Sequence, residues 1–226
     1  MCQAEEVSIL TSPILRIGKI AQTQHRKTVQ RHLVKTSNGQ RRNPGMKRCS
    51  WVNLNSPCYI DYHDHEWGVP EHNDRRLFEM LILESFQAGL SWLTILKKRQ
   101  AFQIAFDGFD PALVARYDLD KVEALMSDTG IVRNRRKIQA AIQNTKVFLS
   151  ICEEFGSFDC YLWGFTQGKT IVNRDDVLPT HSALSDRISA DLKRRGMKFV
   201  GTTIIYSYLQ AVGVVNDHEL GCDFHR

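Results

Sequence analysis

Hydrophobic residues recur three and four positions apart over much of the chain, which is the spacing of amphipathic helices. Side chains that can accept hydrogen bonds from the free N–H groups of a helix precede many of these runs. The predicted helix starts are Asn73, the vicinity of Ser91, Asp110, either Asp118 or Asp120, and Ser182. Residues 202–212 are mostly apolar, which predicts a central helix, and Gly196 is expected to end the helix before it.

The rest of the chain gives weaker signals for secondary structure. Residues 159–165 are aromatic and short, and we interpret them as the start of a further helix. Residues 166–180 are expected to form a loop. No segment shows the convincing alternation of apolar and polar residues that half-buried strands require. The predicted fold class is therefore all-α, without a repeat of fixed period.

Residues 125–142 predict two helices joined by a turn. One helix is expected to end at Gly130 and the next to begin within a few residues, with Ile131, Ile138 and Ile142 packed between them. A helix N-terminus offers free N–H groups to a phosphate, so the pattern fits a helix-hairpin-helix that holds the DNA backbone. It also fits an ordinary charged helix start. The candidate DNA contacts in this turn are Arg133, Asn134, Arg135, Arg136 and Lys137.

The net charge of +5 is unevenly distributed along the chain. Residues 1–48 hold ten Lys/Arg and two Asp/Glu, whereas the remainder holds twenty and twenty-three. Any DNA-binding face outside the N-terminal segment must therefore be a local patch. We interpret residues 1–46 as a flexible basic leader, and 47–226 as the folded domain. The leader fits a solvated tail, an arm that attracts phosphates, or an organelle-targeting peptide.

The six cysteines form no dense framework, and a chain of 226 residues can build a core without disulfides. No apolar run approaches the roughly 20 residues of a membrane helix. The sequence is therefore expected to encode a soluble, monomeric, cytoplasmic protein of bacterial type, without a membrane partner.

Two cysteines and two histidines form a candidate metal site from opposite ends of the predicted domain: Cys49, His63, His218 and Cys222. Two thiolates and two imidazoles suit tetrahedral zinc, and four protein ligands leave no position for a reacting water. Other candidates exist, because Cys58 can stand in for Cys49 in the sequence. His65, His72 and His225 are also candidate metal ligands. The alternative to a metal site is a buried free cysteine and a buried histidine whose ring nitrogens are hydrogen-bonded within the core.

Several motifs occur in a fixed order and together point to one family. They are Cys49-x-Trp51, 59–70 (YIxYHDxEWGVP), 77–81 (LFEML), 83–84 (LE), 87–92 (QAGLSW), 130–134 (GIxRN), 198–203 (KFVGTT) and 215–218 (VNDH). From about Arg48 to Cys222, the chain resembles the 3-methyladenine DNA glycosylase I family. This resemblance implies a helix-hairpin-helix glycosylase fold with one structural zinc ion joining the two ends of the domain. It also favours the Cys49, His63, His218 and Cys222 ligand set.

The resemblance further implies hydrolysis of the N-glycosidic bond of 3-methyladenine in double-stranded DNA. The base would be flipped into an aromatic pocket, and the products would be free 3-methyladenine and an abasic site. No candidate lysine nucleophile stands out in the sequence, which predicts a monofunctional enzyme without strand cleavage. Glu84 maps onto the catalytic carboxylate, with Tyr62 and Trp92 expected to stack on the base. The other pocket positions are Trp51, Tyr59 and Trp67. Gln87, Gly89 and Leu90 map onto the turn that probes the duplex, with Leu90 as the wedge.

Two positions depart from the family pattern. Ser85 stands where a glycine is expected, and the chain lacks the cysteine- and proline-containing tail expected after Cys222. Three alternative functions remain open at this point: a catalytically silent module that binds damaged DNA, a glycosylase for another alkylated purine such as 3-methylguanine, and a zinc-dependent hydrolase. Asp159 is a possible water-activating residue that the sequence does not assign.

Overall fold

The computed structural model describes residues 45–175 and 178–225. Its helices and strands, in chain order, are α1 (Pro57–His65), α2 (Asp74–Gln87), α3 (Trp92–Ala105), the 3-10 helix η1 (Asp107–Phe109), α4 (Pro111–Val114), α5 (Leu119–Ser127), α6 (Arg135–Phe155), α7 (Phe158–Gly164), β1 (Ile171–Val172), α8 (Ala183–Arg194), α9 (Thr202–Ala211) and β2 (Val215–Asn216). The predicted all-α class is confirmed. The predicted leader falls almost entirely outside the described residues.

Side-chain caps explain where most of these helices begin. The side chains of Asn73, Ser91 and Asp118 accept backbone N–H groups at the starts of α2, α3 and α5, as the sequence predicts. Ser182 forms a reciprocal capping box with Ser185 at the start of α8. The predicted helix starts are thus confirmed where a polar cap precedes an apolar run.

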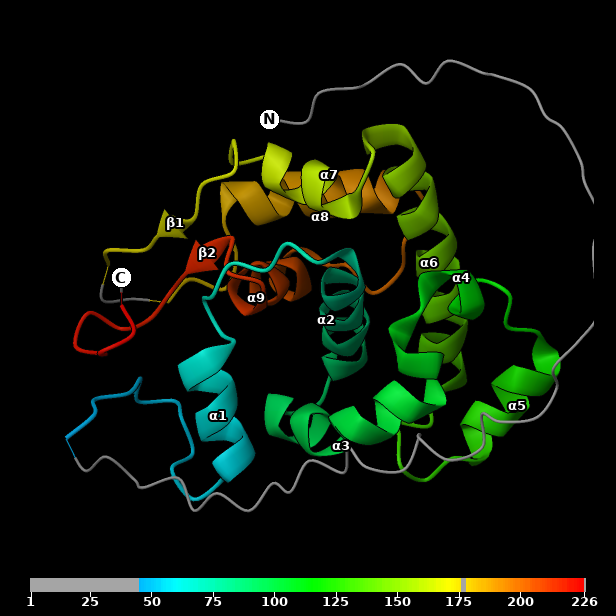
Figure 1. Ribbon diagram of the computed structural model, residues 1–226, viewed down its shortest axis with the longest axis horizontal. Helices are drawn as coiled ribbons and strands as arrows, with labels where there is room; N and C mark the ends of the chain where they lie inside the picture. Colours follow the sequence, from blue (N-terminus) through cyan, green and yellow to red (C-terminus); the bar gives the residue numbers. More distant parts are fainter. Residues whose placement is uncertain (1–44, 176–177, 226) are drawn as a thin grey trace, which may run out of the picture. The chain divides into compact units, whose positions relative to one another are not determined.

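Helix α2 lies at the centre of the described fold (Figure 1) and packs against α3, α6, α7 and α9. Ten consecutive residues of α2, from Leu77 to Phe86, are buried. Burial on all sides fits a helix with neighbours around it, and it places Glu84 inside the protein. At the N-terminal end, the Asp74 carboxylate accepts backbone N–H groups at the start of α7. The C-terminal end leads into the turn before α3.

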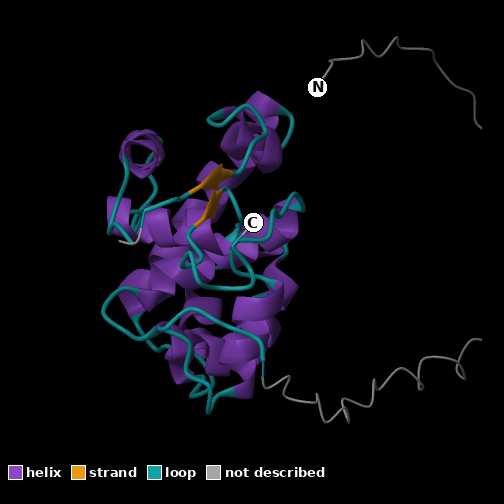
Figure 2. Cartoon of the chain, turned by 90° about the vertical axis from the view of Figure 1, so that its left-hand side faces the viewer, coloured by secondary structure: helices purple, strands orange, loops and turns teal. Residues whose placement is uncertain are grey.

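Besides helix α1, which the sequence did not predict, two features differ from the sequence prediction. The helix expected to end at Gly130 ends at Ser127, because the Asp128 side chain accepts the Gly130 N–H and holds it in the loop. A short parallel pairing joins Ile171 to Val215, and it supplies the strands in Figure 2. Two residues per strand are too few to produce an alternating pattern.

No helix in the described part of the chain is long and apolar enough to span a bilayer.

Candidate active site and metal centre

One cavity of about 250 Å³ is lined by all six predicted pocket side chains. These are Trp51, Tyr59, Tyr62, Trp67, Glu84 and Trp92. Glu84 comes from the last turns of α2, and the aromatic residues come from α1, its flanking segments and the first residue of α3. The fold thus places one carboxylate among five aromatic rings, although these residues are spread over three separate helices and two connecting segments.

The Glu84 carboxyl group is buried without a partner among the described residues. The residue is 2% exposed, and its Oε2 atom has no hydrogen bond. Burial raises the pKa of Glu84 to about 8. The indole N–H groups of Trp51 and Trp92 also lack hydrogen-bond partners. Because buried polar groups are nearly always paired, three unpaired groups in one cavity indicate a site for a polar ligand.

The aromatic rings of the cavity pack in two groups, Trp51 with Tyr59 and Trp67, and Tyr62 with Trp92. The centroids of Tyr62 and Trp92 are 5.3 Å apart at an interplanar angle of 54°. A flat base between two rings needs about 7 Å, two contacts of about 3.5 Å each. In this conformation the two rings therefore contact each other, and stacking of both on one base would require one ring to move. Their stacking role stays a prediction.

Four further residues line the cavity, and the sequence prediction did not place them in the pocket: Gln87, Leu178, Ser207 and Gln210. Ser207 and Gln210 are polar residues three positions apart in the apolar helix α9, so they share one face. These two polar residues interrupt an apolar helix, and this interruption is the sequence signal that could have placed them in the pocket. The Gln210 amide donates to the buried Asp217 carboxylate at 2.5 Å, which fixes its orientation at the cavity.

Ser85 does not line this cavity. Its side chain is buried, and its hydroxyl donates to the Leu81 carbonyl at 2.8 Å, within α2. The serine at this position therefore contributes no side chain to the lining of the cavity.

The turn between α2 and α3 presents a hydrophobic side chain beside the cavity. Gln87 lines the cavity, and its carbonyl accepts the Leu90 N–H at 2.6 Å, which closes the turn. Gly89 has a φ of 79°, a conformation that side-chain-bearing residues rarely adopt. Leu90 is 40% exposed, unlike the buried leucines of α2.

The predicted DNA contacts in the α5–α6 loop have different environments. Arg133 and Arg136 are exposed. Asn134 caps α6 by accepting the Lys137 N–H, and Arg135 forms an exposed ion pair with Glu123. Lys137 is only 7% exposed, and its ammonium group donates to two backbone carbonyls. The sequence prediction of Lys137 as a DNA contact does not fit this environment, because the side chain turns into the protein and its ammonium group binds backbone carbonyls.

The predicted metal ligands form a second site. The ligand atoms of Cys49, His63, His218 and Cys222 all lie within 4.8 Å of one another, and all four residues are buried. Sulfur–nitrogen distances within the cluster are 3.4 to 3.5 Å. Tetrahedral zinc, with bonds of about 2.3 Å to sulfur and 2.0–2.1 Å to nitrogen, separates such atoms by about 3.6 Å. The cluster therefore fits a metal ion of this kind.

The second nitrogen of each imidazole is hydrogen-bonded away from the cluster. His63 Nδ1 donates to the Asp64 carboxylate at 2.8 Å, and Asp64 in turn pairs with Arg48. His218 Nε2 donates to the Trp67 carbonyl at 3.0 Å. Metal-binding histidines are typically oriented in this way. Burial lowers the pKa of both imidazoles, which keeps them neutral and able to bind a metal.

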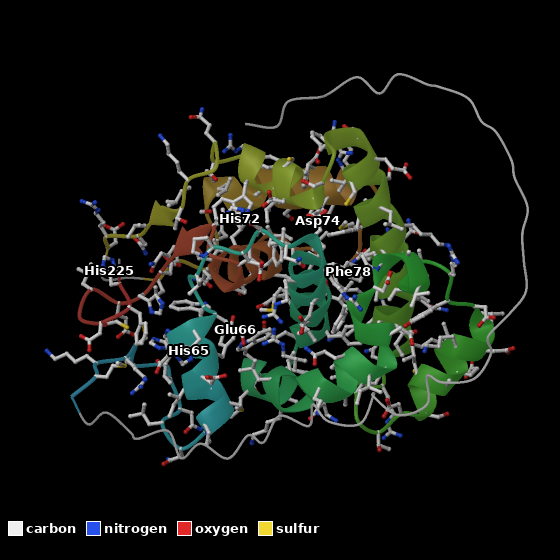
Figure 3. All side chains as sticks on the ribbon, in the orientation of Figure 1. His65, Glu66, His72, Asp74, Phe78 and His225 are labelled. Carbon is white, nitrogen blue, oxygen red and sulfur yellow. The ribbon has the colours of Figure 1, made fainter. Side chains whose placement is uncertain are left out.

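The competing ligand candidates lie elsewhere in the described residues. Cys58 is exposed, and His65 pairs with Asp61 on the surface of α1. His72 pairs with Asp159, and His225 contacts the Asn173 carbonyl from the C-terminal loop. Figure 3 labels His65, His72 and His225 in three separate parts of the ribbon. The structure therefore selects Cys49, His63, His218 and Cys222 from the candidates.

The cluster supports two walls of the cavity. The Trp51 ring packs edge-on against His63 with centroids 5.3 Å apart, and Trp67 packs against His218 at 4.6 Å. Trp51 and Trp67 also contact each other at 4.7 Å. The positions of both tryptophans therefore depend on the metal ligands behind them.

Asp159 lies at the other end of α2 from Glu84. Its backbone N–H donates to Asp74, the first residue of α2, and its carboxylate pairs with His72. Ten residues of helix separate Asp74 from Glu84, a rise of about 15 Å. A larger hollow of about 510 Å³ includes Asp191, but that carboxylate already pairs with Tyr161 and two arginines. Neither aspartate is available to the aromatic cavity.

Comparison with known proteins gives the family of this chain. The methyladenine glycosylase family model matches residues 51–226, more than half of the chain. The chain belongs to this family. DNA-3-methyladenine glycosylase 1 of Escherichia coli (strain K12) is 48% identical to this glycosylase over 180 residues, which cover 78% of this chain and 96% of that protein.

Solved structures support the same assignment. A crystal structure of a 3-methyladenine DNA glycosylase I is 48% identical, with a TM-score of 0.76 over 80% of this chain and 100% of that one. A variant of such an enzyme, crystallised in complex with 3-methyladenine, is 35% identical to the present glycosylase. It also has a TM-score of 0.76 and covers 80% of this chain and 98% of that one.

Proposed function

We propose that this glycosylase hydrolyses the N-glycosidic bond of 3-methyladenine in alkylated double-stranded DNA and releases the free base. The observation that carries the proposal is the buried, unpaired carboxyl group of Glu84 inside a cavity walled by aromatic rings. The activities named for the similar enzymes agree with this assignment.

The chemistry of the damaged base explains why such a cavity suffices. Methylation at N3 gives adenine a positive charge and weakens the glycosidic bond, so the base leaves with little acid assistance. Aromatic faces attract cations by about 0.5–2 kcal/mol each. Ionised Glu84 would accept a hydrogen bond from the exocyclic amine and neutralise the charge of the base. Normal adenine is neutral and cannot compensate a buried carboxylate, so the site favours the damaged base.

The base must leave the duplex to reach this cavity, because enzymes that act on bases take them out of the stack. We propose that Leu90 fills the vacated position in the duplex and that Gln87 and Gly89 shape its turn. Arg133, Asn134, Arg135 and Arg136 would hold the backbone through the start of α6, where free N–H groups suit a phosphate.

Leu90→Ala is expected to reduce base flipping. The smaller side chain cannot occupy the gap that the base leaves, so we expect single-turnover release from methylated duplex DNA to fall by about tenfold, the effect of about 1.4 kcal/mol. The affinity for undamaged DNA should change by less than twofold, because backbone contacts dominate it. Rapid-quench assays and fluorescence anisotropy would measure the two quantities. Equal single-turnover rates would exclude the wedge role.

The proposal includes hydrolysis by water without strand cleavage. No lysine is among the cavity-lining residues in the described part of the chain, which supports hydrolysis without a lysine nucleophile. The environment of Asp159 also argues against a role for this carboxylate in activating water.

Asp159→Asn is therefore expected to keep base release within twofold of the wild-type rate. The substitution weakens the contact with His72, which is exposed, and the thermal midpoint should fall only slightly. Release of 3-methyladenine under single-turnover conditions is the measurement. A loss of tenfold or more in a folded protein would show that the carboxylate acts in the reaction.

We further propose that the metal bound by Cys49, His63, His218 and Cys222 is zinc and that its role is structural. Two sulfur and two nitrogen ligands are a common zinc set, and four protein ligands leave no open position for substrate or water. The ion would therefore join the two ends of the domain and take no part in hydrolysis.

Release of free base from methylated duplex DNA tests the proposed function directly. The wild-type protein is expected to free 3-methyladenine, identified by chromatography, and to release nothing from untreated DNA. Binding to methylated DNA without release would instead identify a damage-binding module. Preferential release of 3-methylguanine or another alkylated purine would keep the reaction class and change the substrate.

A further inference from the structure

Lys137 is a buried cation without a counter-ion. Its ammonium group reaches from the first turn of α6 to the end of α2, where it donates to the carbonyls of Phe86 at 2.8 Å and Ala88 at 2.5 Å. Among residues 45–175 and 178–225, no carboxylate forms an ion pair with it, and burial lowers its pKa. Carbonyls at a helix C-terminus lack helical partners and attract cations. Lys137 therefore holds the beginning of the turn that carries Leu90.

A second lysine makes the reciprocal connection. Lys98 lies on α3, on the other side of the same turn, and its ammonium group donates to the carbonyls of Thr129 at 2.9 Å and Gly130 at 3.0 Å. These carbonyls belong to the loop between α5 and α6. Four lysine–carbonyl hydrogen bonds thus join the α2–turn–α3 segment to the α5–loop–α6 segment. Each segment donates two of these bonds and accepts two. Hydrogen bonds from charged donors are about twice as strong as neutral ones.

We propose that Lys137 and Lys98 are positioning residues that fix the Leu90 turn relative to the α5–α6 loop. This inference rests on the proposed function, in which the loop holds the DNA backbone and Leu90 enters the duplex. The turn follows directly from the helix that carries Glu84. The hydrogen bonds of Lys137 and Lys98 therefore also set the distance between the loop that binds the DNA backbone and the aromatic cavity that receives the base. An exact register matters because a misplacement of about 1 Å at a reacting site can reduce a rate by about 100-fold.

Lys137→Met tests the proposal, since it removes the charged donor and keeps an unbranched side chain. We expect single-turnover base release to fall by about 10- to 100-fold and the affinity for DNA to change by less than threefold. Binding of free 3-methyladenine should stay within twofold, because the cavity walls do not include Lys137. Base flipping should decrease together with the rate of base release, as monitored by the fluorescence of a 2-aminopurine placed beside the lesion.

Two controls separate positioning from other roles of a lysine. Lys146→Met removes an exposed lysine from the same helix and should leave every measurement unchanged. Arg136→Met removes an exposed charge beside Lys137 and should weaken DNA binding. The slope of the logarithm of the binding constant against the logarithm of the salt concentration should decrease in magnitude by about one, which corresponds to the loss of one phosphate contact. Lys98→Met should lower the single-turnover rate as Lys137→Met does. It also provides the test if the Lys137 variant does not fold, because Lys98 is only partly buried.

Hydrogen exchange distinguishes failure of this inference from failure of the proposed function. Amides of residues 88–91 should exchange at least tenfold faster in Lys137→Met than in the wild type, whatever the substrate. Unchanged exchange would overturn the positioning role. An active wild type with a fully active Lys137→Met variant would also overturn it and leave the proposed function intact. A wild type that releases no base would refute the proposed function. It would also refute the proposed role of Lys137 and Lys98 in aligning the Leu90 turn with the α5–α6 loop on DNA, even if hydrogen exchange accelerates in the variant.

Discussion

Replacing Glu84 with glutamine is expected to lower kcat/KM for base release by about 10- to 100-fold and to stabilise the free protein at alkaline pH. Glutamine keeps the size of the side chain and an acceptor oxygen, but it cannot neutralise a cationic base. Hydrogen bonds to charged groups contribute about 1.5–3 kcal/mol, and each 1.4 kcal/mol corresponds to a tenfold change. The loss should therefore appear in the reaction and not in the fold.

The stability change follows from the pKa of Glu84. Burial raises this pKa from 4.5 to about 8, so the folded protein holds a proton that the unfolded chain has released between these values. The contribution of Glu84 to the free energy of unfolding is fully present below pH 4.5 and is lost as the pH rises through about 8. Glutamine does not titrate, so the variant should exceed the wild type in stability at pH 9 by a few kcal/mol.

The same titration should shape the activity. Only the ionised carboxylate neutralises the charged base, so wild-type kcat/KM is expected to rise with pH through about 8, and the rise should be absent in Glu84→Gln. Among the described residues, Tyr59 and Tyr62 are titratable groups that line the same cavity as Glu84, and burial raises the pKa of both.

Single-turnover release between pH 5 and 9.5 and denaturant unfolding at the same values would measure both effects. Glu153→Gln, at an exposed position on α6, is the matched control and should match the wild type in both. A Glu84→Gln enzyme with wild-type kcat/KM would show that this carboxylate does not contact the base during the reaction.

Removing one ligand of the metal cluster is expected to cost most of the folding stability and to distort the aromatic cavity. Structural zinc sites bind with apparent free energies of about 10–16 kcal/mol, comparable to the total stability of a domain of about 5–15 kcal/mol. In Cys222→Ala, we expect the thermal midpoint to fall by more than 10 °C and the bound metal to be lost. Any folded remainder should bind 3-methyladenine poorly, because Trp51 and Trp67 pack on His63 and His218.

Elemental analysis, thermal melting and tryptophan fluorescence of the metal-loaded protein would measure these changes. Cys58→Ala removes an exposed cysteine and should leave all three unchanged. A strong chelator should reproduce the effect of Cys222→Ala in the wild type. If the chelated protein keeps its melting temperature, its fluorescence and its affinity for the base, the cluster does not support the cavity.

Local signals in the sequence predicted most of the helices but not all of their ends. Asn73, Ser91 and Ser182 are polar residues before apolar runs, and each caps a helix. Helix α1 was not predicted, because Ser56 makes no side-chain cap and aromatic residues obscure the periodicity. Gly130 was assigned to a helix end, although a side chain two residues earlier holds it in the loop.

The candidate site depended more on long-range contacts. The pocket residues and metal ligands could be named because their motifs resemble a known family, whereas spacing alone left the alternatives open. Lys137 stands in a run of basic residues, and nothing local indicates that its ammonium group contacts carbonyls 49 and 51 residues earlier in the chain. Its partners depend on tertiary packing, which periodicity does not describe.

The contacts of the tryptophans with the candidate metal ligands constrain the order in which the protein can mature. Trp51 and Trp67 are made early during synthesis, but Trp67 packs against His218, which follows 151 residues later. A nascent chain can form α2 and α3 before it has a complete binding cavity. The cavity therefore becomes competent only when the C-terminal segment folds back onto the first residues of the domain, so chains that stop before His218 should be released without a finished site.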